Sequence, residues 1–189
     1  SIMPRGLTGD VDVSSRYLPS RELGGDSFNY IWIDDDHLLV YLLDVSGHGI
    51  EPALLSVSIY NMLRSGSIPI ENLLQPEALL AEMNRLFQMD QQNDHYFTIW
   101  YGVYQASTRT LRYASAGAPP ALAFTLADDG AVSVTQLSTP AEPVGMFEDT
   151  EFTSAAYRVP PGCRILVHSD GASELDLADG TQLSLAGFR

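Results

Sequence analysis

The order in which hydrophobic periodicities follow one another restricts the fold of this chain most strongly. Strand-like segments, apolar or alternating, fill the beginning and the second half, and helical periodicity is confined to the stretch between them. Strands are expected at residues 11–17, 28–33, 37–45, 96–106, 110–116, 121–126, 132–137 and 164–168. Helices are expected from Pro52 to Gly66 and from Pro76 to Phe87, each with a proline suited to a first helical turn. Turn residues at 107–109 and 128–130 favour antiparallel hairpins, so the order predicts an α+β domain with helices packed on antiparallel sheet.

Size and charge exclude several classes of protein. With 189 residues, 45% of them hydrophobic, the chain fits one globular domain with a substantial core. Its 10 basic and 24 acidic residues give a net charge of −14, so neither nucleic acid nor an anionic membrane is expected as a partner. A solvated acidic surface would show the same excess, so only individually placed carboxylates indicate a site. No apolar run reaches the roughly 18 residues of a membrane span and no signal-peptide pattern opens the chain, which predicts a cytoplasmic location.

The chain has one cysteine, and its first residues are expected to belong to a linker. Cys163 alone cannot form an internal disulfide or a cysteine-based zinc cage, and it precedes a strand-like segment, so we expect a structural thiol. Ser1 is not an initiator methionine, and Pro4-Arg5-Gly6 suits the end of a linker. The expected division is a linker remnant at 1–9 and a single domain at 10–189.

Three short stretches place an aspartate beside glycine at or next to an expected strand. They are Gly24-Gly25-Asp26, Asp44-Val45-Ser46-Gly47-His48-Gly49 and Ser169-Asp170-Gly171. Carboxylate and main-chain oxygens are the ligands that Mg²⁺ or Mn²⁺ prefers, and glycine lets the backbone approach an ion closely. The two shorter stretches, taken alone, are also ordinary turn signals. Asp26 and Asp44 are expected to lie close together, where a two-metal cluster would neutralise their repulsion, and the three stretches together indicate metal-assisted phosphate chemistry.

One of the four histidines lies within these motifs. His48 stands between two glycines, four residues after Asp44. His37, His95 and His168 have no matching neighbours in the sequence and are expected to be surface residues or internally bonded core residues. His48 is therefore the histidine that we assign to chemistry.

These residues resemble the motifs of the PPM-type metal-dependent serine/threonine phosphatases. Asp26 in Gly-Gly-Asp, Asp44 in Asp-Val-Ser-Gly-His-Gly and Asp170 in Ser-Asp-Gly-Ala-Ser-Glu are similar to the SpoIIE-like bacterial branch of that family. Further similar stretches, in a resemblance that runs from about Asp10 to Glu174, are 96–98, 111–117 and 142–145. Because this branch often forms the output domain of response regulators and stress-signalling switches, the resemblance implies a receiver domain N-terminal to this one.

The resemblance also implies a metal site and a reaction. The fold would contain two antiparallel β-sheets flanked by α-helices, with Mn²⁺ or Mg²⁺ at one edge. Asp26 and Asp44 would bind or bridge the metals, the Val45 carbonyl would contribute, and Asp170 would bind one metal. The metals would activate a water for in-line attack on phosphorus, with His48 as candidate general acid for the departing seryl or threonyl oxygen. The implied substrate is a phosphoserine or phosphothreonine on a regulatory protein, such as a protein of a sigma-factor pathway.

Three departures from the family pattern leave a second function open. Asn29 stands where the first motif usually has an acidic residue, and Ala118 stands where a histidine often follows Ala-Gly. Only 19 residues follow Asp170, too few for the family's last helix and its strand with a further metal-binding aspartate, so a C-terminally short domain is expected. The alternative is a catalytically eroded domain that binds a protein, as in response-regulator adaptors that deliver a sigma factor to a protease. The phosphatase is preferred because all four candidate side chains of the site are retained.

Overall fold

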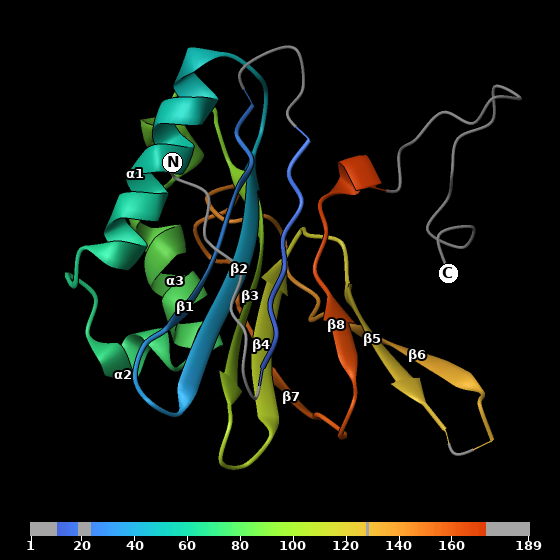
Figure 1. The fold of residues 1–189 in the computed structure, drawn as a ribbon. Helices are drawn as coiled ribbons and strands as arrows, with labels where there is room; N and C mark the ends of the chain where they lie inside the picture. Colours follow the sequence, from blue (N-terminus) through green and yellow to red (C-terminus); the bar gives the residue numbers. More distant parts are fainter. Residues whose placement is uncertain (1–10, 19–23, 128, 173–189) are drawn as a thin grey trace, which may run out of the picture.

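Eight strands, three α-helices and two short 3₁₀ turns make up the described part of the chain (Figure 1). The computed structural model describes residues 11–18, 24–127 and 129–172, so the expected linker and the expected C-terminal shortening lie outside the described residues. The strands are β1 (Ser27–Trp32), β2 (His37–Val45), β3 (Phe97–Gln105), β4 (Thr110–Ala116), β5 (Ala121–Leu126), β6 (Val132–Leu137), β7 (Ala155–Arg158) and β8 (Arg164–Leu166). The helices are α1 (Ile50–Arg64), α2 (Ile70–Leu73) and α3 (Pro76–Leu86), and the 3₁₀ turns are η1 (Met89–Gln91) and η2 (Asp170–Ala172).

The strands form two sheets, and each strand runs antiparallel to its paired neighbours. One sheet has five strands in the order β1-β2-β3-β4-β7, and the other has three in the order β6-β5-β8. Hairpins join β1 to β2, β3 to β4 and β5 to β6, as the acidic turn after β1 and the turn residues at 107–109 and 128–130 predict. The expectation of an α+β fold with two antiparallel sheets is therefore confirmed.

The helices lie on one face of the five-stranded sheet, and the three-stranded sheet lies on its other side (Figure 1). A first core between helices and sheet includes Leu43, Ile59, Leu79 and Met83, all of them fully buried. The side chains of β2 that join this core are buried, whereas Val40 and Leu42 on its other face are only partly buried, so the expectation that both faces are covered is met fully on the helix side alone. Within the described ranges the α-helices flank this sheet alone, and none of them is long and apolar enough to cross a membrane.

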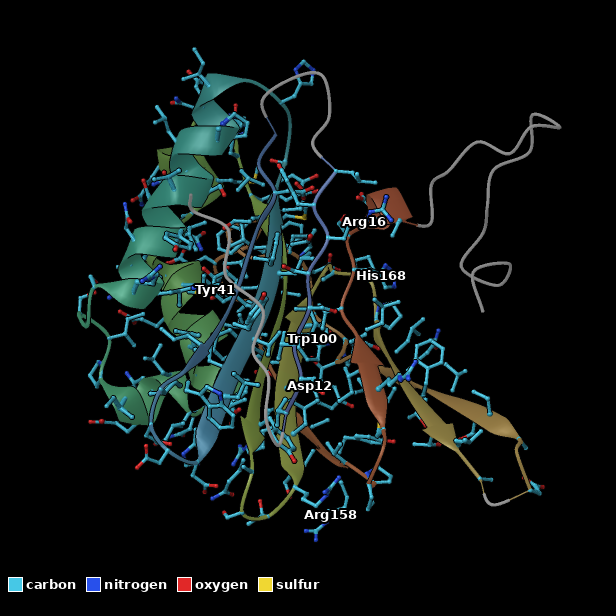
Figure 2. All side chains as sticks on the ribbon, viewed as in Figure 1. Asp12, Arg16, Tyr41, Trp100, Arg158 and His168 are labelled. Carbon is cyan, nitrogen blue, oxygen red and sulfur yellow. The ribbon has the colours of Figure 1, made fainter. Side chains whose placement is uncertain are left out.

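Trp100 connects the two sheets. It belongs to the core between them, whereas Tyr41 belongs to the core on the helix side; both are labelled in Figure 2. The Trp100 ring stacks on Tyr113 with centroids 6.0 Å apart, and its Nε1 donates a hydrogen bond to the Leu137 carbonyl oxygen at 2.9 Å. A Cβ at Gly102 would lie 2.5 Å from the indole, so glycine makes room for this ring. The contacts of one aromatic side chain thus span the space between the sheets.

Three elements differ from the sequence-based expectation. The prediction of a strand at 11–17 is wrong, since in this segment only Val13 forms a β-bridge. Tyr17 packs on Phe28 with ring centroids 6.2 Å apart, so its contact with β1 is made by side chains. The sequence does not predict α2 or β7, because four residues are too few to display a period.

A buried asparagine holds the loop that follows β6. Asn84 of α3 donates hydrogen bonds to the carbonyl oxygens of Phe147 and Glu148 at 3.0 and 3.1 Å. Its Oδ1 accepts a hydrogen bond from the Gly145 N–H at 2.7 Å. Gly145 has a φ of 87°, and a Cβ there would lie 2.1 Å from the Phe87 carbonyl oxygen. Glycine is therefore required at this position, and α3 sets where the loop lies.

Candidate metal centre

Asp26 and Asp44 lie opposite one another at one edge of the five-stranded sheet. Ser27 of β1 pairs with Leu43 of β2, and the next position in this register places Asp26 opposite Asp44. Directly opposed residues in an antiparallel pair have Cβ atoms about 4.5–5.5 Å apart and share a face of the sheet. The two carboxyl groups are hydrogen-bonded to each other. The structure therefore brings together the two aspartates that the sequence pairs.

Glycine at position 25 permits this approach. A Cβ on Gly25 would lie 2.7 Å from both the Cβ and the carbonyl oxygen of Val45, and 3.0 Å from its nitrogen. Any other residue would push the segment that carries Asp26 away from β2. Gly24 is not constrained in this way by the described residues, among which the nearest atom to its Cβ position is the Asp26 nitrogen at 4.0 Å. The second glycine of the Gly-Gly-Asp motif is the one that the site requires.

The Val45 carbonyl faces the side on which Asp26 lies. The Ser46 N–H donates a hydrogen bond to the Tyr96 carbonyl oxygen at 2.9 Å, on the β3 side. The C=O and N–H of one planar trans peptide point in opposite directions, so the Val45 carbonyl points away from Tyr96. Its oxygen is the atom that a Cβ on Gly25 would meet, which agrees with this direction. A main-chain oxygen thus lies beside the paired carboxylates.

Asp170 approaches the same region from the end of β8. It begins η2 and lines, together with Asp44, a cavity of about 280 Å³. The other lining residues are Leu42, Thr98, Gly117, Ala118, Pro119 and Ser169. Within the described part of the chain, none of the lining residues is basic, and the polar side chains among them are two carboxylates and two hydroxyls. The sequence does not single out Thr98 or Ser169, although each lies in a stretch that it identifies.

The three carboxylates perturb one another. Burial first, and then the charges of Asp26 and Asp170, raise the pKa of Asp44 from 3.8 to about 7. The pKa of Asp26 is also raised, mainly by burial. The hydrogen bond with Asp44 lowers it, and the charge of Asp170 raises it further. The site therefore holds more negative charge than it can stabilise near neutral pH, and a bound cation would neutralise it.

The donor set fits a hard divalent cation in its chemistry. Two opposed carboxylates, a third that acts on them through its charge, and a main-chain carbonyl are oxygen ligands of the kind that Mg²⁺ and Mn²⁺ prefer. Among residues 11–18, 24–127 and 129–172, no group of three or more His, Cys, Asp or Glu side chains is arranged closely enough to hold a metal ion. Within these residues the structure thus contains one close pair of the expected ligands, and Asp170 lines the same cavity as Asp44.

The four histidines lie in different surroundings. The backbone of His48 forms a β-bridge with Gly24, two residues before Asp26, and its side chain is exposed. Its role as general acid stays a prediction. His37 pairs with Asp34 at 2.9 Å, and His168 is buried with Nδ1 2.9 Å from the Ser169 carbonyl oxygen. His95 is half-buried and contacts the Ser46 carbonyl oxygen, so all three are bonded internally, as expected.

The residues that depart from the family pattern have identifiable surroundings. Ala118 forms part of the cavity wall, so the absence of a histidine changes the cavity itself. Asn29 is 5% exposed, and its Oδ1 accepts a hydrogen bond from the Tyr30 N–H at 2.9 Å, which is a structural role.

The single cysteine does not have the properties of a reactive group. Burial raises the pKa of the half-buried Cys163 thiol, whereas a reactive thiolate has a lowered pKa. This agrees with the structural thiol that the sequence predicts.

The arrangement of the two sheets and their helices matches that of solved structures, among them a PP2C domain. The SiaA-PP2C domain of Pseudomonas aeruginosa superposes with a TM-score of 0.70 at 20% sequence identity, covering 88% of this chain and 64% of that one. RsbX, solved in complex with magnesium, superposes with a TM-score of 0.58 at 17% identity, covering 87% of this chain and 76% of that one. At these identities the likeness concerns the fold alone. It defines a PP2C-type phosphatase fold, in which the aspartate pair occupies one sheet edge.

Sequence comparison identifies the family. The family described as Stage II sporulation protein E (SpoIIE) matches residues 34–188. Phosphoserine phosphatase RsbP of Bacillus subtilis (strain 168) is 34% identical over 172 residues, which are 89% of this chain and 41% of RsbP. The chain therefore belongs to the SpoIIE family. It spans less than half of the length of this curated relative.

Proposed function

We propose that this chain is a metal-dependent protein serine/threonine phosphatase domain. Its substrate would be a phosphoserine or phosphothreonine on a regulatory protein in bacterial signalling. The observation that carries the proposal is the opposed pair of Asp26 and Asp44, beside the Val45 carbonyl and next to a cavity that Asp170 also lines. Membership of the SpoIIE family and the similarity to RsbP, which is named as a phosphoserine phosphatase, support it.

The charge of the site supports a requirement for a cation. A phosphate monoester is an anion and would meet the carboxylates of Asp44 and Asp170 in the cavity wall. The chain contains no lysine, and among the described residues no arginine lines the cavity. Arg85 and Arg112 form ion pairs with glutamates elsewhere. Because the phosphate and these two carboxylates would repel one another inside one cavity, a divalent cation such as Mn²⁺ or Mg²⁺ would have to accompany the substrate.

The residues of the site would have separate roles. The ligands for the cation would be Asp26, Asp44, Asp170 and the Val45 carbonyl. A bound cation would supply activation of a water molecule and neutralisation of the charge that develops on the phosphoryl group. His48 would donate a proton to the departing seryl or threonyl oxygen, which leaves slowly as an alkoxide. Its exposed position next to Gly24 suits a group that meets a protein substrate at the surface.

Phosphatase assays of the purified protein test the proposal. We expect hydrolysis of an aryl phosphate and of a phosphoserine peptide with Mn²⁺ or Mg²⁺, and none in EDTA. Asp44→Asn and Asp26→Asn should each lower kcat by about a hundredfold or more, the loss typical of removing a group that stabilises charge in the transition state. Asp35→Asn, in the exposed turn between β1 and β2, is the matched control and should retain activity.

Metal binding by calorimetry separates the possible outcomes. Equal heats of Mn²⁺ binding for the parent and for Asp44→Asn would refute the metal site. If the protein shows no metal-dependent turnover but binds a regulatory protein, the eroded adaptor domain is the better description.

The cellular context is a further part of the proposal. We infer a cytoplasmic output domain of a response regulator, with a receiver domain N-terminal to it in the full-length protein. The resemblance of its motifs to the SpoIIE-like branch supports this. The reading frame upstream of Ser1 tests it, and a segment there without receiver motifs would refute the receiver domain.

A further inference from the structure

The segment 44–49, here called the metal loop, contains a bulge beside β1. The register of β1 and β2 would place Gly24 opposite Ser46, but the bridge observed joins Gly24 to His48. Ser46 and Gly47 are therefore extra residues on the β2 side, and Gly47 adopts a φ of 90°. A bulge disrupts the ladder locally, so its conformation depends on contacts from elsewhere. The directions of the two preceding groups, the Asp44 carboxylate and the Val45 carbonyl, depend on that conformation.

His95 packs against this bulge from the β3 side. Its Nδ1 lies 2.8 Å from the Ser46 carbonyl oxygen, and its Cε1 lies 3.5 Å from the position of a Cβ on Gly47. A carbonyl oxygen can only accept, so Nδ1 carries the hydrogen and donates it. The adjacent Tyr96 accepts a hydrogen bond from the Ser46 N–H at 2.9 Å and donates one to the Ser46 hydroxyl at 3.1 Å. Both peptide groups of Ser46 are thus held by the segment that leads into β3.

The other ring nitrogen of His95 faces the start of α1. Its Nε2 lies 3.5 Å from Oε2 of Glu51, in the first turn of the helix. The Glu51 side chain is 65% exposed, so solvent screens this contact and it stabilises the loop little. The His95 ring, with 19% of its side chain exposed, makes its shorter contact with Ser46. Of the two contacts that His95 makes, the hydrogen bond to the Ser46 carbonyl is therefore the one that acts on the bulge.

We propose that His95 is a positioning residue of the candidate metal centre. By holding the Ser46 carbonyl it fixes the bulge, and through the bulge it directs the Val45 carbonyl and the Asp44 carboxylate toward Asp26. Without this hydrogen bond the bulge populates several conformations, and a cation binds only the fraction in which its ligands converge. The effect on metal affinity rests on the proposed function, whereas the ordering of the loop is a property of the metal-free protein.

Three substitutions distinguish the two nitrogens of the ring. His95→Asn keeps a donor near the position of Nδ1, His95→Gln keeps one near Nε2, and His95→Leu keeps neither. Hydrogen exchange of the Ser46 amide is measured in EDTA, and the Mn²⁺ dissociation constant is measured by calorimetry. For His95→Leu and His95→Gln we expect exchange about tenfold faster and a dissociation constant about three- to tenfold higher, the factors that loss of one ordinary hydrogen bond gives. His95→Asn should recover most of both values.

Two further variants serve as controls. His37→Leu removes a histidine–carboxylate contact with Asp34 at the opposite end of β2, and it should change neither measurement. Glu51→Gln weakens the second contact of His95, and it should change the Mn²⁺ dissociation constant by less than about twofold.

The outcomes separate this proposal from the proposed function. If Ser46 exchanges no faster in His95→Leu and His95→Gln than in His37→Leu, the proposal is overturned. Faster exchange with unchanged Mn²⁺ affinity overturns it as well, as does an equal loss in His95→Asn and His95→Leu. A parent protein that binds no Mn²⁺ refutes the proposed function, and the exchange rates then test the positioning of the loop by themselves. Should His95→Leu not fold, the comparison of His95→Asn with His95→Gln provides the same test.

Discussion

Asp44→Asn should make the metal-free protein more stable at neutral and alkaline pH. Burial and the charges of Asp26 and Asp170 raise the pKa of Asp44 from 3.8 to about 7. Between these values the folded state keeps a proton that the unfolded state has released, so the free energy of unfolding falls as the pH rises from about 4 to about 7. Asparagine is neutral throughout this range and has an N–H that can donate to Asp26. The free energy of unfolding of the variant should therefore not show this fall between about pH 4 and pH 7.

The pKa difference sets an upper limit on the gain. A difference of about three pH units corresponds to about 4 kcal/mol. Asp44 is partly exposed, and solvent screens the repulsion between the carboxylates, which reduces the expected gain to about 1–2 kcal/mol. For a chain of this length such a gain raises the melting temperature by roughly 2–8 °C. Below about pH 3, where Asp44 is largely protonated in both states, the parent and the variant should melt together.

Thermal unfolding in EDTA across this pH range measures the effect, with Asp35→Asn as the control. Addition of Mn²⁺ should then stabilise the parent and leave Asp44→Asn unchanged, because a ligand stabilises only the state that binds it. Asp44→Asn is thus expected to increase stability relative to the parent in EDTA and to lose the stabilisation that Mn²⁺ gives the parent. A stability difference between Asp44→Asn and the parent that does not vary with pH would refute the close approach of the carboxylates. Equal stabilisation of both proteins by Mn²⁺ would refute the ligand role of Asp44.

Two further predictions concern residues that place the site and its surroundings. Gly25→Ala puts a Cβ 2.7 Å from Val45, and it should lower the free energy of unfolding by about 1–3 kcal/mol and weaken Mn²⁺ binding. Gly24→Ala, whose Cβ would lie no closer than 4.0 Å to the described residues around it, should do neither. Thermal melts and calorimetry compare the two variants, and equal losses would contradict the argument. Asn84→Ala removes the acceptor of the buried Gly145 N–H and the amide donor to the Phe147 and Glu148 carbonyls, and it should lower the free energy of unfolding by about 1–3 kcal/mol in urea. A loss of less than about 0.5 kcal/mol would show that the loop does not depend on α3.

The sequence predicts the elements whose signal is local and long. β2 agrees with its predicted range at both ends, because nine residues with a continuous apolar run contain enough pattern to define a buried strand. β7 has four residues at the edge of a sheet and is recognisable only from its pairing with β4. The segment 11–17 shows the opposite case, since it alternates as a strand would but pairs only at Val13. Alternation of apolar and polar residues indicates which side chains are buried. It does not show whether a neighbouring strand offers free hydrogen-bonding groups, and backbone pairing requires such a neighbour.

For the candidate site, the sequence by itself determined the pairing of Asp26 with Asp44. The two residues lie at the open end of one hairpin, where the turn and the alternation of side chains set the register. Only the tertiary structure placed Asp170 at the same cavity and His95 against the metal loop. Those contacts join segments far apart in the chain, and they depend on how the two sheets pack and how β3 lies beside β2. No local periodicity contains that information, because it reports the face on which a residue lies and not which distant segment covers that face.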